Sequence, residues 1–258
     1  MGSCRLCLET RYLRRSHVIA NAWFKTIKRR DAGKVIQFDD SKDGIARYSV
    51  DSWSEELLCD PCEQYFSDLE KYACETLREA SAGKAPSEGA LLRDIDYRKL
   101  KRFFTSLLWR AAVSTLVPFA KVNLPGQYVE ELRKSLRSGK ALPPRQLACR
   151  LQRVFDPRPA NQGGFKTDAL EHFIISPIPR LSQRDACFLF LLGGYLLEIF
   201  VPSPSLHEWR TLGMLKDDTK LFAPAKNIFD VPEIRKLLLA GHTKQALGLQ
   251  ADNLKRRR

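Results

Sequence analysis

The sequence predicts an α+β protein in which a small metal-binding unit, residues 1–80, precedes a mixed helical and antiparallel-sheet unit, residues 90–258. Two Cys-x-x-Cys pairs in the first quarter of the chain predict the small unit. Amphipathic helical patterns, followed by short apolar runs between turn residues, predict the larger one. A chain of 258 residues has room for a small and a larger domain.

Residues 1–13 are predicted to form a short knuckle around the first cysteine pair. The segment 16–30 has apolar residues at helical spacing, and Ser16 is placed to cap that helix. Residues 34–38 and 45–50 flank the turn-rich stretch DDSKDG, which predicts a β-hairpin.

A helix is predicted to start at the second cysteine pair. Asp60 suits the N-cap and Pro61 the first helical position, while Glu63 takes the reciprocal place in a capping box. The Gly-, Ser- and Pro-rich segment 81–89 then predicts the boundary between the two units.

The larger unit is predicted to begin with two helices, to continue with strands and to end in a late helix. The helices are expected at 96–116, at 127–139 with Gly139 as the C-terminal glycine, and at 233–241. The strands are expected at 147–155, 171–178, 186–192 and 195–201, the last two forming a hairpin across Gly193 and Gly194.

The positive charge is concentrated at the two ends of the chain. Lys and Arg exceed Asp and Glu by 43 to 30, a net charge of +13. Residues 1–30 hold eight basic side chains against one acid, the last four residues are KRRR, and the chain between is nearly neutral. Such clusters are typical of surfaces that bind polyanions, with a solvated charged face as the alternative. The residues expected to contact phosphates are Arg11, Arg14, Arg15, Lys28, Arg29 and Arg30.

The longest apolar run, residues 186–201, is too short to span a bilayer and contains Glu198. No basic leader followed by an apolar stretch opens the chain. We therefore expect a soluble, cytoplasmic protein with no membrane partner. Thiols stay reduced in the cytoplasm, so paired cysteines there bind metal more often than they form disulfides.

Two Cys-x-x-Cys pairs predict one structural zinc ion, because each pair lets two thiolates reach one tetrahedral ion. Four unrelated cysteines are the alternative. A zinc ribbon would carry both pairs on β-turns, whereas here the second pair runs into a helix; the order knuckle, hairpin, helix predicts a treble clef, a ββα-metal-like unit. The expected ligands are Cys4, Cys7, Cys59 and Cys62, and the cysteines expected in the core are Cys74, Cys149 and Cys187.

The segments CRLC, SHVIANAWFK and LLCDPCEQYFSDLEKY resemble the zinc-containing HNH endonucleases, in particular a bacterial and phage-associated group with the pattern CxxC, SH, LCxxCE. The later FFTSLLWRAAVS resembles a segment of the same group. The zinc motif covers about the first 75 residues. The resemblance implies metal-dependent hydrolysis of phosphodiester bonds in DNA, and it points to phage defence or mobile-element biology.

By position, His17 matches the general base of that family, and the resemblance implies a catalytic Mg²⁺ or Mn²⁺ ion. Two departures stand against it: Ser16 replaces the Asp or His that normally holds this ion, and the closing histidine on the helix is missing. Glu63 is the expected substitute ligand, with Asn21 or Glu70 as weaker candidates. The alternatives are that Glu63 only caps its helix and that His17 only contacts a phosphate or packs on the knuckle.

Three functions therefore stay open. The first is an HNH-like nuclease, and the second is a zinc-containing nucleic-acid-binding protein without cleavage activity. The third is a protein-interaction module whose zinc is structural. The basic charge within residues 1–30 favours the first two.

Overall fold

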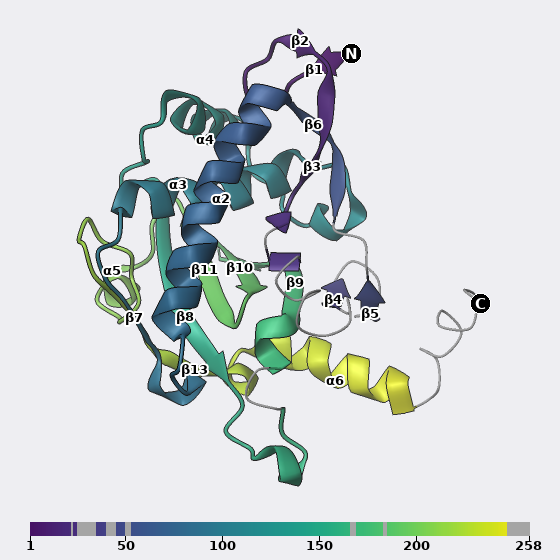
Figure 1. Cartoon of the computed structure of the whole chain (residues 1–258), viewed down its shortest axis with the longest axis vertical. Helices are drawn as coiled ribbons and strands as arrows, with labels where there is room; N and C mark the ends of the chain where they lie inside the picture. Colours follow the sequence, from purple (N-terminus) through teal and green to yellow (C-terminus); the bar gives the residue numbers. More distant parts are fainter. Residues whose placement is uncertain are drawn as a thin grey trace.

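The structure is a computed structural model of the chain, and it describes residues 1–21, 23–24, 35–39, 45–49, 53–165, 169–182 and 185–246. It is a mixed α+β fold (Figure 1). The cysteine-bearing N-terminal part lies at one end of the molecule, and the main sheet lies toward the other (Figure 1).

The N-terminal part contributes four short strands, β1 (Gly2–Ser3), β2 (Thr10–Arg11), β3 (Leu13–His17) and β6 (Ser54–Cys59). β1 pairs with β2 around the knuckle, and β3 pairs with β6; both pairs are antiparallel. The expected N-cap at Ser16 is wrong, because Ser16 lies within β3 and is fully buried. Residues 21, 23 and 24 are helical, and 22 and 25–30 lie outside the described residues.

Helix α2 (Asp60–Ser81) starts at the second cysteine pair, as predicted, but without the predicted capping box. Cys59 takes the N-cap position and no side chain caps the helix. The reason is that Cys59 ends β6 and its backbone N–H donates to Cys4 Sγ at 3.4 Å, so the chain turns into the helix at the cysteines. Asp60 lies within the first turn and pairs with Arg14 at 3.0 Å.

The helices predicted for the larger unit are confirmed. They are α3 (Tyr97–Val113), α4 (Gly126–Ser138) and α6 (Pro232–Ala246), with a short α5 (Leu206–Trp209). Asp96 caps α3 by accepting from the backbone N–H of Lys99, and Gly139 ends α4 at φ 69°, a conformation that favours glycine. Five 3₁₀ turns are described, at Pro86–Glu88, Val117–Phe119, Ala160–Gln162, Ala169–His172 and Ile228–Asp230.

Seven strands form the main sheet in the order β13-β8-β11-β10-β9-β4-β5. Their bounds are β4 (Val35–Asp39), β5 (Ile45–Ser49), β8 (Ala148–Phe155), β9 (Phe173–Leu181), β10 (Ala186–Leu192), β11 (Tyr195–Val201) and β13 (Ala225–Asn227). Both predicted hairpins, β4 with β5 and β10 with β11, are antiparallel pairs. The pairings β4 with β9 and β13 with β8 are parallel. A separate antiparallel pair joins β7 (Ala90–Leu92) to β12 (Leu221–Ala223).

Helices cover both faces of this sheet. The core on one face joins α2 and α3 to side chains such as Phe188, Phe190 and Leu197, and Tyr195 Oη donates to the backbone carbonyl of Leu77 in α2 at 2.9 Å. The core on the other face joins Ile234 of α6 to strands β9 and β10.

Residues from both sides of the predicted boundary at 81–89 share the first core, and β4 joins β9 in one sheet. The division into units 1–80 and 90–258 stays a prediction. Within the described residues, no helix is both long enough and apolar enough to cross a membrane.

Candidate metal centre and adjoining cavity

The four cysteines of the two pairs converge at the junction of knuckle, β6 and α2. Cys4 and Cys7 belong to the knuckle turn, and Leu8, directly after Cys7, has φ 65° and donates its backbone N–H to the Cys4 carbonyl at 2.8 Å. Cys59 ends β6, and Cys62 lies in the first turn of α2. All four Sγ atoms lie within 4.8 Å of one another, so the cluster could hold a metal ion.

The spacing of the sulfur atoms fits a tetrahedral zinc ion. A Zn–S bond of about 2.3 Å places two ligand sulfurs about 3.8 Å apart. Cys7 Sγ and Cys59 Sγ lie 3.7 Å apart. The donor set of four thiols, on two segments that meet only in the folded chain, is therefore suited to a structural zinc ion.

The surroundings of the cluster shift the pKa values of its thiols in different directions. Burial works against ionisation of Cys4, yet backbone N–H groups of Cys59, Cys7 and Leu6 lower the pKa of its thiol to about 7. Burial, together with the neighbouring sulfurs, raises the pKa of Cys62 and, to a smaller extent, of Cys7. One thiolate discourages ionisation of the next, and a divalent cation removes this conflict.

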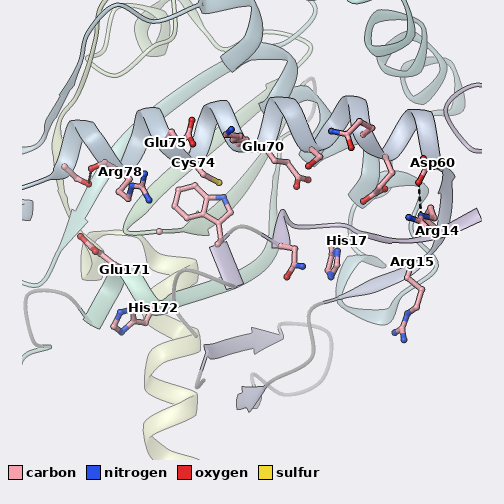
Figure 2. A pocket seen from close by; sticks show the side chains of 18 residues that line it. Arg14, Arg15, His17, Asp60, Glu70, Cys74, Glu75, Arg78, Glu171 and His172 are labelled. Carbon is pink, nitrogen blue, oxygen red and sulfur yellow. Dashed lines mark hydrogen bonds and ion pairs between the residues drawn. The ribbon is translucent and has the colours of Figure 1, made fainter. Parts of the chain in front are cut away.

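A cavity of about 630 Å³ runs along one face of α2 (Figure 2). Its lining residues on α2 recur at helical spacing from Asp60 to Ser81, which corresponds to roughly 30 Å of helix. The opposite side comes from the end of β3, from Asn21 and Trp23, from Glu171 and His172, and from the β10–β11 turn. One end therefore lies beside the four-cysteine cluster and the other beside the main sheet.

Four residues that the sequence singled out as candidates for the general base or for ligands of a catalytic ion line this cavity: His17, Asn21, Glu63 and Glu70. Glu63 does not serve as a capping acid, and its Oε2 is buried without a hydrogen-bond partner among the described residues. Ser16 is fully buried, donates its Oγ to the Arg14 carbonyl at 3.4 Å and is absent from the lining. Ser16 thus offers no ligand to an ion in the cavity.

Arg110 of α3 connects the elements that form this end of the cavity. Its Nη1 donates to the backbone carbonyl of His17 at 2.7 Å and to Glu70 Oε1 at 2.5 Å, and its Nε donates to the carbonyl of Ser106 at 3.3 Å. The guanidinium is fully buried and lies 5.2 Å from the ring centroid of Phe66. β3, α2 and α3 are therefore joined through one side chain.

Glu70 is the buried partner of this arginine. Its side chain is 14% exposed, and burial raises the pKa of its carboxyl group, an effect that Arg110 partly offsets. Sequence reasoning missed Arg110, although an arginine among the apolar residues of an amphipathic helix is a usable signal for a buried ion pair.

Two of the predicted phosphate-binding residues, Arg14 and Arg15, line the cavity. Arg14 pairs with Asp60, and Arg15 Nη2 donates to Ser54 Oγ at 3.2 Å; both arginines are exposed. Arg11 lies on β2 and pairs with Glu9. Lys28, Arg29, Arg30 and the basic tail lie outside the described residues.

Glu171, His172 and the Gly193 turn line the far end of the cavity, and sequence reasoning assigned none of them to a site, although it predicted the turn itself. They lie roughly 150 to 180 residues after His17 in the chain, so local pattern carries no signal for their proximity. Of the single cysteines, Cys149 and Cys187 are buried in the core as predicted, whereas Cys74 is half-buried and lines the cavity.

Comparison of the chain with models of protein families, with curated proteins and with solved structures gave no match. A role for the cavity therefore has to be argued from its own residues.

Proposed function

We propose that the protein is a zinc-containing, metal-dependent endonuclease of the HNH type that acts on DNA in the cytoplasm, with residues 1–80 as a treble-clef unit. One observation carries this proposal: His17 and Glu63 line the same cavity, and Glu63 directly follows Cys62 of the four-cysteine cluster. The knuckle, the β3–β6 pair and the start of α2 at the second cysteine pair support the treble-clef assignment.

His17 is proposed to accept a proton from the water that attacks the phosphodiester, because imidazole is an effective base near neutral pH. Glu63 and Asn21 present oxygen atoms of the kind that Mg²⁺ or Mn²⁺ prefers. When bound, such an ion would stabilise charge on the phosphate and the leaving oxygen. Glu63 suits the ligand role better than Glu70, since Glu63 Oε2 has no partner among the described residues whereas Glu70 is held by Arg110.

Arg14 and Arg15 are proposed to hold the phosphate backbone, because both are exposed, line the cavity and lie on the strand that ends at His17. The resemblance to phage-associated proteins makes phage defence or mobile-element biology the proposed setting.

A second candidate is a nucleic-acid-binding protein on the same frame that does not cleave. The burial of Ser16 favours it, because the position before His17 then contributes no ligand to a catalytic ion. In that case His17 would contact a phosphate directly.

Cleavage assays with freshly purified protein decide between the two. Supercoiled, linear duplex and single-stranded DNA are incubated with Mg²⁺ or Mn²⁺, and we expect cleavage that His17→Ala reduces by at least about 100-fold. His207→Ala, at an exposed position on α5, is the matched control and should cleave like the wild type. DNA binding by a wild-type protein that contains zinc but never cleaves would establish the second candidate.

A further inference from the structure

Helix α4 contacts the knuckle that carries the first cysteine pair. Arg133 Nη1 donates to the backbone carbonyl of Leu6 at 2.7 Å, across 127 positions of the chain. Leu6 lies between Cys4 and Cys7 and is buried. α4 lies at the same end of the molecule as β1 and β2 (Figure 1). The loop between the two cysteines is therefore held by a side chain from outside the N-terminal part.

Arg133 is itself held in one orientation by Glu130, one turn earlier in α4. Its Nε donates to Glu130 Oε2 at 2.7 Å, and its Nη2 donates to Glu130 Oε1 at 2.8 Å. The arginine side chain is 16% exposed. A planar guanidinium with two nitrogens fixed on a carboxylate presents its third nitrogen in a fixed direction. Nη1 is therefore fixed toward the Leu6 carbonyl.

The Leu6 carbonyl shares a peptide bond with the backbone N–H of Cys7. In a trans peptide the carbonyl and the N–H point in opposite directions from one rigid plane. On the other side of this plane, the Cys7 N–H donates to Cys4 Sγ. Among the described residues, no backbone N–H donates to the Leu6 carbonyl, so Arg133 holds the plane from the carbonyl side. A hydrogen bond outside the cluster therefore fixes one inside it.

Hydrogen bonds to Cys4 Sγ bear on how firmly the cluster holds a metal ion. N–H groups that donate to a ligand sulfur stabilise the charge of the thiolate and orient it. We propose that Arg133 is a positioning residue of the metal centre: by holding the Leu6–Cys7 peptide, it keeps the Cys7 N–H on Cys4 Sγ and slows the loss of zinc. This inference rests on the zinc ion of the proposed function and not on cleavage of DNA.

Zinc release from the full chain tests the proposal. Purified variants are mixed with the chromogenic chelator 4-(2-pyridylazo)resorcinol, and absorbance follows the release of the ion. Arg133→Ala should release zinc about tenfold or more faster than the wild type, as expected when a partner that orients a metal ligand is lost. Lys134→Ala is the matched control and should release zinc at the wild-type rate, because this exposed ammonium reaches Glu130 at 3.8 Å and not the knuckle.

The spectrum of the Co²⁺-substituted protein separates positioning from a general loss of stability. A hydrogen bond to a thiolate lowers the energy of the sulfur electrons, so its loss should move the thiolate-to-cobalt charge-transfer band to longer wavelength. We expect this shift in Arg133→Ala and not in Lys134→Ala. If Arg133→Ala fails to fold, Arg133→Lys takes its place, because an ammonium cannot hold the carboxylate and the carbonyl in one planar fork.

Equal rates of zinc release in the wild type and Arg133→Ala would overturn the positioning role and leave both the zinc ion and the nuclease proposal intact. Faster release with an unchanged charge-transfer band would also overturn it, because Arg133 would then only stabilise the fold. The same conclusion would follow if Lys134→Ala accelerated release as much as Arg133→Ala. A wild type that binds neither Zn²⁺ nor Co²⁺ would overturn the zinc assignment together with this inference.

Discussion

Arg110 donates a hydrogen bond of 2.7 Å to the backbone carbonyl of His17, a residue 93 positions earlier in the chain. The same Nη1 atom reaches Glu70 in α2, so the end of β3 is held against two helices by one buried cation. This contact fixes the backbone of the proposed base without occupying its imidazole ring.

Removal of this arginine should be costly. Arg110→Ala leaves Glu70 buried without its cation, and we expect a loss of about 3–5 kcal/mol in the free energy of unfolding, measured by urea titration. The double variant Arg110→Met with Glu70→Leu should regain most of it, because no buried charge is left unpaired. A single variant as stable as the wild type would show that the pair does not hold β3 in place.

The cysteine cluster predicts one zinc ion per chain. Cys59→Ser should lose the ion and the cooperative unfolding of the N-terminal part, because the affinity of such a site is largely folding energy. Elemental analysis and thermal denaturation measure both effects. Cys74→Ser, outside the cluster, should keep the ion; a wild type purified without stoichiometric metal would contradict the assignment.

Glu63 is predicted to bind the divalent cation. Mn²⁺ should raise the melting temperature of the wild type but not of Glu63→Gln, while without Mn²⁺ the two should agree within about 0.5 kcal/mol, since no cap is lost. Glu75→Gln, on the same helix, should respond to Mn²⁺ like the wild type. An unchanged Mn²⁺ response in Glu63→Gln would remove Glu63 from the site.

Arg15 is predicted to contact phosphate. Arg15→Ala should weaken DNA binding alike for unrelated sequences and reduce the slope of log affinity against log salt by about one. Lys134→Ala on α4 is the charge-matched control, and its slope should stay at the wild-type value. If Arg15→Ala and Lys134→Ala have the same salt slope, Arg15 is a solvated surface residue that contacts no phosphate.

The stability of the chain should depend on Glu233 at acid pH. Arg180 Nε lies 2.8 Å from Glu233 Oε1, and this hydrogen bond lowers the pKa of the carboxyl group below its ordinary value of 4.5. A lowered pKa in the folded state stabilises the fold above pH 4.5 and is lost as the pH falls below it. Glu233→Gln should therefore cost about 1 kcal/mol at pH 7 and nothing at strongly acid pH, measured by denaturation at both values.

Most elements of this fold follow from local pattern. The apolar spacing of residues 96–116 predicts α3, the glycine pair at 193–194 predicts the β10–β11 turn, and the spacing of the cysteines predicts their cluster. In each case a short stretch of sequence decides the geometry. The missed capping box has a local cause too, because Cys59 serves both β6 and the cluster and so occupies the N-cap.

The candidate site was predictable only in part. His17, Glu63 and the cysteines are identified by motif, but the partners Arg110, Glu171 and Trp23 meet through the packing of α2 against α3 and the main sheet. Such packing depends on contacts between residues far apart in sequence, which periodicity does not encode. The order of strands in the main sheet was out of reach for the same reason.

The parallel pairing of β4 with β9 means that β4 must wait for its partner strand during synthesis of the chain. Ile36 lies opposite Phe173, so a ribosome that adds about 5–20 residues per second needs roughly 7–30 s to make the second partner after the first. Through that interval the hairpin of β4 and β5 presents an unsatisfied strand edge, the kind of edge that recruits other nascent chains. Slow translation or overexpression should therefore lower the yield of native protein through association of incomplete chains.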